Sequence, residues 1–216
     1  TQGVSSAASD VYKRQVLLDS GAKVDAKPEQ LVQSAIMGSV YAESQLGIKN
    51  PRVGLLNIGE EETKGNEQCL ATYPLLKANP HIHFIGNVEG RDINKGTVDV
   101  VVCDGFTGNV VLKTMEGLGS AVLEIIRSAV KGSGFLSKFG ALLMKPALTE
   151  VKRKMDASEY GGALLLGVRA PFIICHGSSK AKAIKNAVRV AIELTEKDIV
   201  GKIGREILRD EESGEL

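Results

Sequence analysis

Hydrophobic and polar positions along the chain form two kinds of segment. Short apolar runs rich in Val, Leu and Ile, typical of buried strands, alternate with longer segments that have apolar residues at helical spacing. The expected strands are residues 16–19, 52–57, 82–85, 98–103 and 172–175. The expected helices are residues 28–47, 66–78, 108–130 and 179–208, the last with a break near Thr195. This order of strands and helices predicts a doubly wound α/β domain with a mostly parallel sheet.

The first fifteen residues do not follow this pattern. Residues 1–15, TQGVSSAASDVYKRQ, show neither strand nor helix periodicity and stop abruptly at the apolar Val16. They look like a foreign leader rather than native protein, so we expect this segment to be disordered and outside the fold. The expected organisation is one α/β domain over residues 16–216, with a helical hairpin inserted at residues 131–156.

Composition excludes several classes of function. The chain has 216 residues, of which 43% are hydrophobic, and a net charge of +1, so it can bury a core and has no basic field for nucleic acid. Its three cysteines lie far apart without zinc-ligand spacing, which fits a reducing compartment. It has no long apolar run and no signal-like start, and we therefore expect a cytoplasmic protein.

Three glycine-containing polar loops follow three of the expected strands. They are IGEEETKGNE after residues 52–57, DGFTGN after 98–103 and HGSSK after 172–175. In an open parallel sheet, ligands bind outside the carboxyl ends of the strands. We therefore expect the three loops to converge on one rim, where free backbone amides at helix starts are aimed at an anion.

Each of these loops also has a plain structural interpretation. Thr107 or Asn109 can cap the next helix in an ordinary turn, His176 can be a structural hydrogen-bonding group, and Lys64 can be a solvated charge among glutamates. The chain lacks the GxxxxGK[ST], GxGxxG, GxSxG and HExxH motifs. Asp104 after a strand is a possible magnesium ligand, but one carboxylate is weak evidence for a metal site.

Five blocks in order carry a resemblance to a known family. They are VGLLNIGEEETKGNE, HFIGNVEGRDI, VDVVVCDGFTGNVVLKTMEG, YGGALLLG and HGSSKAKAIKNA. They are similar to blocks of the bacterial phosphate acyltransferases of phospholipid synthesis, the PlsX family, and the resemblance runs from about Val16 to about Arg209. It implies a fold like isopropylmalate dehydrogenase and phosphate acetyltransferase. Because the family is longer at its amino terminus, it also implies that this chain is a carboxyl-terminal part.

The resemblance implies a reaction in which inorganic phosphate attacks an acyl thioester of acyl carrier protein (acyl-ACP), giving acyl phosphate and free ACP. It further implies a homodimer that associates peripherally with membranes. Phosphate is already anionic at neutral pH, so the protein has mainly to hold it and stabilise the developing charge, with no cofactor or metal.

Site residues carry over from the family's KGN and TGNV blocks. Lys64 becomes a phosphate ligand, and Asn109 a hydrogen-bond donor to phosphate or to the oxyanion. His176 donates to phosphate or assists the departing thiolate. The rest of the expected cradle consists of the backbone amides of Gly108, Gly177 and Ser178. Three positions depart from the family pattern. Lys23 stands where Asn is common, Leu164 where Pro or Ser is common, and Ile174 where Lys is common.

The segment 131–154, KGSGFLSKFGALLMKPALTEVKRK, carries six positive charges against Glu150 alone, and it has a mostly apolar face once it is helical. A basic amphipathic segment of this kind lies on anionic membrane surfaces. The expected membrane contacts are Phe135, Phe139, Leu142 and Leu143. Packing of the hairpin on a second subunit is the alternative, and both can hold.

Two other functions stay open at this stage. One is a metal-dependent decarboxylating dehydrogenase of the same fold, in which Asp104 helps to bind magnesium. It needs further acidic ligands and an adenine-binding segment, which the sequence does not display. The other is a non-catalytic module that binds anions or acts as a membrane scaffold.

Overall fold

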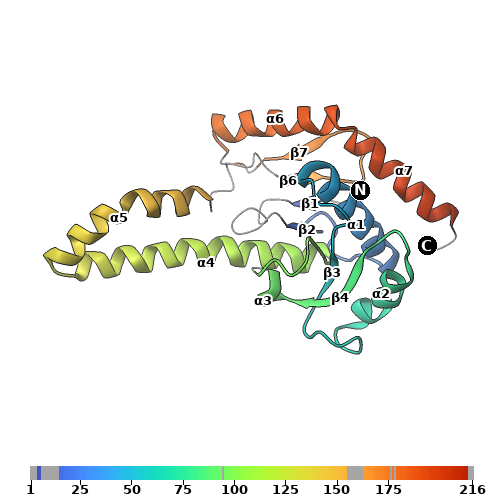
Figure 1. Ribbon diagram of the computed structural model, residues 1–216, viewed down its shortest axis with the longest axis horizontal. Coiled ribbons are helices and arrows are strands. Elements are labelled where there is room, and N and C mark those ends of the chain that lie inside the picture. The colour runs from blue at the N-terminus through green and yellow to red at the C-terminus, as the bar shows by residue number, and fades with distance from the viewer. Residues whose placement is uncertain are drawn as a thin grey trace.

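A computed structural model describes residues 4–5, 15–93, 95–154, 163–175, 177 and 179–213 (Figure 1). At its centre is a five-stranded sheet with the order β1-β2-β5-β3-β4. The strands are β1 (Val4–Ser5), β2 (Val16–Leu18), β3 (Val53–Asn57), β4 (Phe84–Glu89) and β5 (Val100–Val102). β1 pairs antiparallel with β2, and the other four strands are parallel. The expected α/β fold with a parallel sheet is thereby confirmed.

A helix follows each of the parallel strands β2, β3, β4 and β5, and further helices come later in the chain. The helices are α1 (Pro28–Tyr41) with the π-helical turn η1 (Ala42–Leu46), α2 (Glu67–Ala78), α3 (Gly90–Ile93), α4 (Gly105–Gly132), α5 (Phe135–Lys154), α6 (Ala181–Glu196) and α7 (Ile199–Glu212). The α6–α7 break falls at residues 197–198, as predicted near Thr195. None of the helices in the described ranges combines the length and apolarity that a membrane crossing requires.

Both faces of the sheet are buried. Successive strand residues point to opposite faces. Val16 and Leu18 of β2 belong to the core formed with α1, whereas Leu17 packs with Val101 and with Met115 of α4. This two-sided burial explains why β2 and β5 are continuous apolar runs instead of alternating ones.

The segment 1–15 is not wholly outside the fold. Val4 and Ser5 pair with β2, and the buried Gln15 side chain donates a hydrogen bond to the carbonyl of Val98 at 2.8 Å. The expectation of disorder is therefore corrected at these three residues. The remaining residues of the segment lie outside the described part.

The strand predicted at residues 172–175 forms, but in a different sheet. β7 (Phe172–Ile174) pairs antiparallel with β6 (Ala163–Leu165), which the sequence analysis missed. Ile173 packs on the core, while Phe172 and Ile174 are exposed. A three-residue apolar run cannot specify its pairing partner, so placing this segment in the parallel sheet was wrong.

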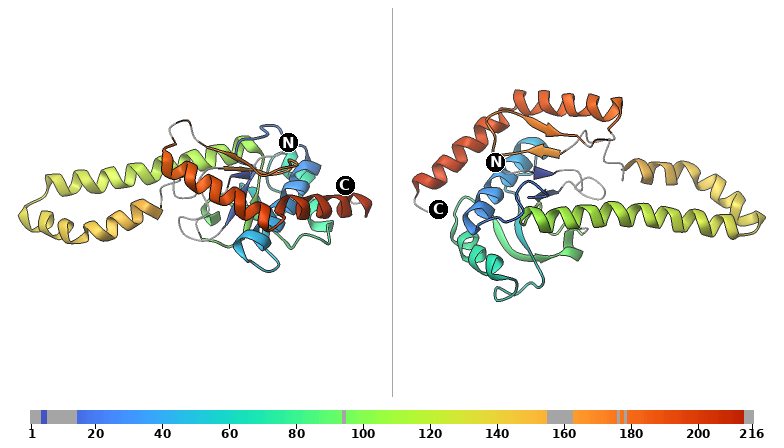
Figure 2. Two further views of the ribbon diagram at one scale, coloured as in Figure 1. Left: turned by 90° about the horizontal axis from the view of Figure 1, so that it is seen from above. Right: turned by 180° about the vertical axis from the view of Figure 1, so that it is seen from behind.

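Helices α4 and α5 project from the sheet as a long hairpin (Figures 1 and 2). Its turn lies at residues 133–134. The basic segment 131–154 is therefore the tip and the second arm, while the first arm starts at the sheet. Placing the start of the hairpin at residue 131 missed that first arm, because α4 continues without interruption from the loop after β5.

Candidate functional site

The loops after β2, β3 and β5 meet at the carboxyl edge of the parallel sheet. The backbone N–H of Gly105 donates to the carbonyl of Lys23 at 2.8 Å, which joins the β5 and β2 loops. The side chain of Gln68, in the first turn of α2, donates to the carbonyl of Ala26. Two of the three loops expected at one rim are thus brought together, with the loop after β2 between them.

The loop that carries Lys64 is fixed by asparagines from two neighbouring strands. Asn57 of β3 donates to the carbonyl of Lys64 at 3.0 Å, and Asn87 of β4 donates to the carbonyl of Glu61 at 2.8 Å. Gly65 has a φ of +106°, and a Cβ there would lie 2.5 Å from the Asn57 Oδ1. The loop therefore needs glycine at this position to close against Asn57.

The Lys64 ammonium is exposed and makes no hydrogen bond or ion pair with any described residue. One of its acidic neighbours has another partner. Glu62 pairs with Lys77 at 2.6 Å, and that hydrogen bond lowers the pKa of Glu62. Glu60 lies with two carboxylates near the end of β4. Because Lys64 pairs with no described carboxylate, it is a cation available to an anionic ligand.

The carboxylates of Glu60, Glu89 and Asp92 lie within 4.8 Å of one another. Cations already accompany two of them, because Arg91 pairs with Glu89 at 2.5 Å and Lys95 with Asp92 at 2.9 Å. The hydrogen bond from Lys95 is the main reason for the lowered pKa of Asp92. This group was not predicted from the sequence, because the expected strand at residues 82–85 ended before Glu89.

Asp104 caps α4, in place of the expected Thr107 or Asn109. Its Oδ1 accepts a hydrogen bond from the Thr107 N–H at 2.8 Å, and its Oδ2 accepts one from the Thr107 hydroxyl at 2.7 Å. Aspartate is among the preferred residues for this role. Because both carboxylate oxygens are engaged and Asp104 lies outside the acidic group, the geometry does not favour it as a magnesium ligand.

Gly108 does not have the role that the sequence suggested. Its N–H donates to the carbonyl of Asp104 at 3.0 Å, inside the first helical turn, so the expected free amide is engaged. A Cβ at Gly108 would overlap the carbonyl oxygen of Asp19. The glycine is needed for close packing of α4 on the loop after β2, and we withdraw its amide from the anion cradle.

Asn109 lies on the same turn of α4 and is exposed. Its side chain passes over Gly21, since a Cβ built on Gly21 would be 3.8 Å from the Cβ, Cγ and Oδ1 of Asn109. Within the described ranges, no hydrogen-bond partner is found for the Asn109 amide. Lys64 and Asn109 thus follow the adjacent strands β3 and β5, and each offers a free donor.

The third expected loop is placed differently. His176 and Ser178 lie outside the described residues. Gly177 is exposed and follows β7, which belongs to the second sheet. Since β7 is not a strand of the parallel sheet, Gly177 does not share the edge at which Lys64 lies.

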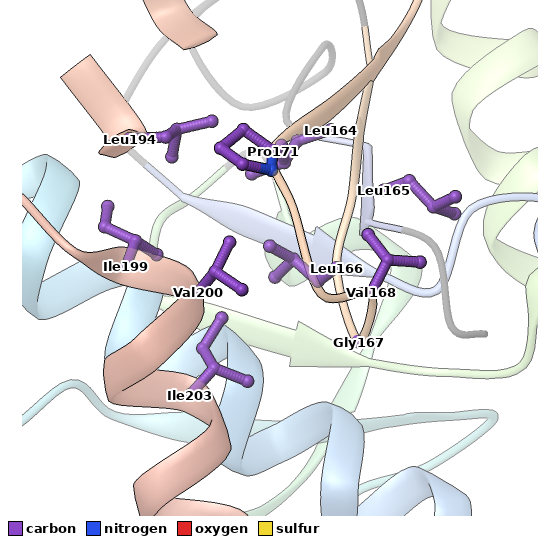
Figure 3. Close-up of a pocket in the computed structure, with 10 residues that line it drawn as sticks. All are labelled: Leu164, Leu165, Leu166, Gly167, Val168, Pro171, Leu194, Ile199, Val200 and Ile203. Atoms are coloured by element: carbon purple, nitrogen blue, oxygen red, sulfur yellow. The ribbon is translucent and has the colours of Figure 1, made fainter. Parts of the chain in front are cut away.

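An apolar pocket lies between the β6–β7 hairpin and helices α6 and α7 (Figure 3). Leu164, one of the positions that depart from the family pattern, is buried in its wall. The other lining residues are Leu165, Leu166, Gly167, Val168, Pro171, Leu194, Ile199, Val200 and Ile203. With no polar side chain, this pocket has nothing to fix a phosphate ion.

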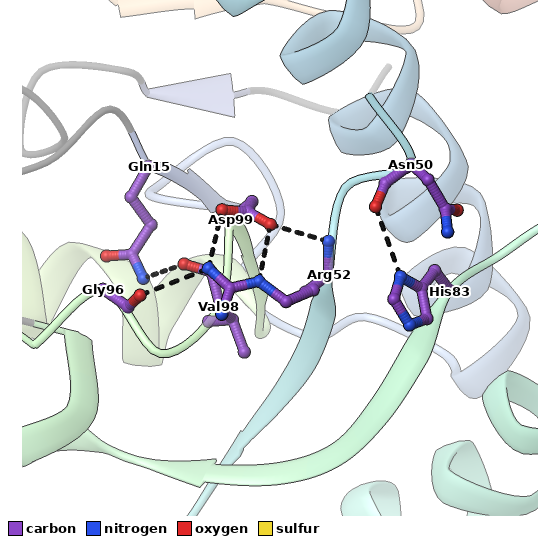
Figure 4. A network of polar contacts seen from close by, with 7 residues as sticks. All are labelled: Gln15, Asn50, Arg52, His83, Gly96, Val98 and Asp99. Atoms are coloured by element: carbon purple, nitrogen blue, oxygen red, sulfur yellow. Dashed lines mark hydrogen bonds and ion pairs between the residues drawn. The ribbon is translucent and has the colours of Figure 1, made fainter. Parts of the chain in front are cut away.

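A polar network stabilises the opposite, amino edge of the sheet (Figure 4). Arg52, just before β3, makes a forked ion pair with Asp99, just before β5: its Nε is 2.9 Å from Oδ2 and its Nη2 is 3.0 Å from Oδ1. The Arg52 N–H also donates to Oδ2 at 2.8 Å. These contacts hold adjacent strands together at a distance from the candidate site.

Comparison with known proteins gives a consistent result. A family model described as "Fatty acid synthesis protein" matches residues 7–202, which includes part of the segment 1–15. The phosphate acyltransferase of Aquifex aeolicus (strain VF5) is 59% identical over 188 residues, which cover 87% of this chain and 55% of the relative. The phosphate acyltransferase of Desulfitobacterium hafniense (strain Y51) is 59% identical over 195 residues, which cover 90% of this chain and 58% of the relative.

A more distant relative agrees with these two. The phosphate acyltransferase of Clostridium perfringens (strain SM101 / Type A) is 54% identical over 194 residues, with 90% of this chain and 57% of the relative covered. The chain thus spans a little more than half the length of the curated relatives that it matches. Since the family model covers most of the 216 residues, this chain belongs to the fatty acid synthesis protein family, the PlsX family of phosphate acyltransferases.

Proposed function

We propose that this chain is the phosphate-binding part of an acyltransferase that converts acyl-ACP and inorganic phosphate to acyl phosphate and free ACP in phospholipid synthesis. One observation carries the proposal: the Lys64 ammonium and the Asn109 amide stand at the carboxyl ends of adjacent strands, both without a described partner. The names of the relatives support the same reaction.

The proposed chemistry uses few groups. Lys64 neutralises hydrogen phosphate and holds it against the thioester, with reacting atoms about 3–3.5 Å apart. Asn109 donates to phosphate or to the oxyanion that forms on the carbonyl oxygen. A phosphate oxygen forms a bond to the carbonyl carbon, the carbon–sulfur bond breaks, and the proton of hydrogen phosphate passes to the ACP thiolate. In this proposal His176 assists the leaving thiolate, and the amides of Gly177 and Ser178 complete the cradle.

We also propose the finer fold and assembly. Helices on both faces of the sheet support a doubly wound domain over residues 16–216, like isopropylmalate dehydrogenase, with the α4–α5 hairpin as an appendage. Exposed apolar residues on α4 support packing against a second copy in a homodimer. They include Leu118, Val122 and Ile125.

The α5 arm supports a peripheral membrane contact from the cytoplasmic side. Its exposed apolar residues include Phe135, Phe139, Leu142 and Leu143. The rings of Phe135 and Phe139 are stacked, with centroids 6.4 Å apart. Lysines on the same arm are suited to anionic lipid, and each basic residue near such a surface contributes about 1 kcal/mol.

The experiment that tests this function follows release of the ACP thiol from acyl-ACP. It uses the 216-residue chain and a chimera that joins it to the unmatched part of the Aquifex aeolicus relative, with that relative as positive control. We expect release that requires inorganic phosphate and does not respond to NAD or magnesium. If neither protein releases thiol in a phosphate-dependent way while the relative does, the proposed function is wrong.

A further inference from the structure

Asp19, directly after β2, is a buried carboxylate that the proposed chemistry does not use. It is 3% exposed. Its Oδ1 accepts hydrogen bonds from the N–H groups of Gly21 and Ala22, both at 3.0 Å, and its Oδ2 accepts one from Lys23 at 2.7 Å. Burial raises the pKa of Asp19, and these amides oppose the rise. Since a buried charge is costly without donors, residues 20–23 fold around the carboxylate.

The folded segment packs directly on the first turn of α4. The carbonyl of Lys23 accepts the Gly105 N–H, and the carbonyl of Asp19 accepts the Cys103 thiol at 3.4 Å. A side chain on Gly108 would overlap that same carbonyl. Because α4 and the folded segment are in such close contact, the position of α4 depends on the conformation of residues 20–23.

The Asn109 side chain rests on the same segment. The atoms of Asn109 and the position of a Cβ on Gly21 are 3.8 Å apart, an ordinary van der Waals distance. Gly21 has a φ of +126°, which glycine adopts without strain. The backbone that Asp19 folds is therefore the surface against which the candidate phosphate donor lies.

We propose that Asp19 is a positioning residue of the phosphate site: its carboxylate fixes residues 20–23, and these hold Asn109 in the orientation that donates to phosphate. The inference rests on the proposed function, because it takes Asn109 as a phosphate ligand. Asp19 itself does not touch phosphate, since its oxygens are occupied by three amides and its charge repels an anion.

The test replaces the carboxylate by an amide of the same shape. Asp19→Asn exchanges one acceptor oxygen for an NH₂ group, which cannot accept an N–H, so the ring of three hydrogen bonds is broken. In the 216-residue chain, calorimetric titration with inorganic phosphate should show a dissociation constant raised roughly tenfold. In ¹⁵N NMR spectra, the Asn109 side-chain signal should no longer shift when phosphate is added. The matched control is Asp25→Asn, an exposed acid of the same loop, which should behave as the wild type.

Two further variants keep the test decisive. If Asp19→Asn gives no dispersed NMR spectrum, the variant Gly21→Ala takes its place. Alanine strains residues 20–23 at the positive φ of Gly21 and leaves the carboxylate unchanged. Gly21→Ala should also weaken phosphate binding. Unchanged affinity and an intact Asn109 shift in the folded variant would overturn the role of Asp19. Lys64→Met separates the proposed phosphate site from the role of Asp19. Equal phosphate affinity in Lys64→Met and the wild type would overturn the site itself. A loss of phosphate affinity in Lys64→Met, but not in the Asp19 or Gly21 variant, would overturn only the role of Asp19.

Discussion

At the scale of single residues, two glycines of α4 have opposite surroundings. The carbonyl of Asp19 occupies the space that a side chain on Gly108 would need, while nothing lies within 4 Å of a side chain on Gly117. Backbone cannot move aside as the end of a flexible side chain does. Gly108→Ala therefore forces α4 away from the loop after β2.

We predict that Gly108→Ala lowers the free energy of unfolding by at least about 2 kcal/mol. The matched control Gly117→Ala should raise it by about 0.5–1 kcal/mol, because alanine is the better helix former. Urea unfolding followed by circular dichroism measures both. Equal stability of the two variants would show that α4 does not pack on Asp19 in this way.

The Arg52–Asp99 pair gives a prediction about pH. Burial alone would raise the pKa of Asp99, but the hydrogen bonds from Arg52 outweigh it, and the pKa lies below its usual 3.8. A carboxylate with a lowered pKa stabilises the fold above its unfolded pKa, and this stability is lost as pH falls through the folded pKa.

We predict that Asp99→Asn costs roughly 1–3 kcal/mol of unfolding free energy at pH 7. The difference from the wild type should shrink as the pH falls below about 4. Glu116→Gln, which breaks the exposed pair between Lys113 and Glu116, should change stability by less than about 0.5 kcal/mol. If the difference in unfolding free energy between Asp99→Asn and the wild type stayed constant down to pH 2, the ion pair would not be the cause of the stability.

The sequence was informative about individual candidates but not about their partners. Lys64 and Asn109 were chosen by motif and position, and the structure leaves both available. The Gly108 amide is engaged because α4 begins at Gly105 and not at the predicted residue 108, so this N–H already belongs to the helix. The burial of Asp19 could not be predicted, because it depends on contacts with residues 84 or more positions away that form only when the sheet does.

At the scale of elements, long periodic segments were predicted well. Residues 28–47 became α1 with its π-helical extension, and residues 66–78 became α2, which is capped by Asn66. Short strands were not predicted as well: β4 lies at residues 84–89 instead of 82–85, and β7 joined another sheet. A run of three or four apolar residues carries too little information to fix its register or its partner strand.

The α5 arm carries a prediction at this scale. Replacing Phe139 and Leu143 by Asp places two charges on the exposed apolar face, so flotation with vesicles of anionic lipid should be strongly reduced. The matched control is Ser137→Asp with Thr149→Asp, which adds the same charge at exposed polar positions of α5, removes no apolar side chain and should retain most of the binding.

The control separates apolar insertion from charge repulsion. Equal loss in both double variants would mean that lipid binding reports only net charge. Undiminished flotation of the Phe139 and Leu143 variant would remove the basis for a membrane contact through α5.

At the scale of the whole molecule, the structure combines a parallel sheet, loops that meet at its carboxyl edge and a projecting hairpin (Figures 1 and 2). The α/β class followed from the order of strands and helices alone. The second sheet did not: the short apolar run at residues 163–166 was not predicted as a strand, and so short a run does not specify which strand it pairs with.

The central claim is that phosphate bound at Lys64 attacks the thioester. The direct measurement supplies acyl-ACP and phosphate labelled with ¹⁸O at all four oxygens to the chain and to its chimera, and analyses the product by mass spectrometry. We predict acyl phosphate that retains all four labelled oxygens, with its rate of formation lowered roughly 10²-fold in Lys64→Met. The rate should be unchanged in Lys49→Met, an exposed lysine before the same strand. Unlabelled free fatty acid as the product, or equal rates in the two lysine variants, would contradict the central claim.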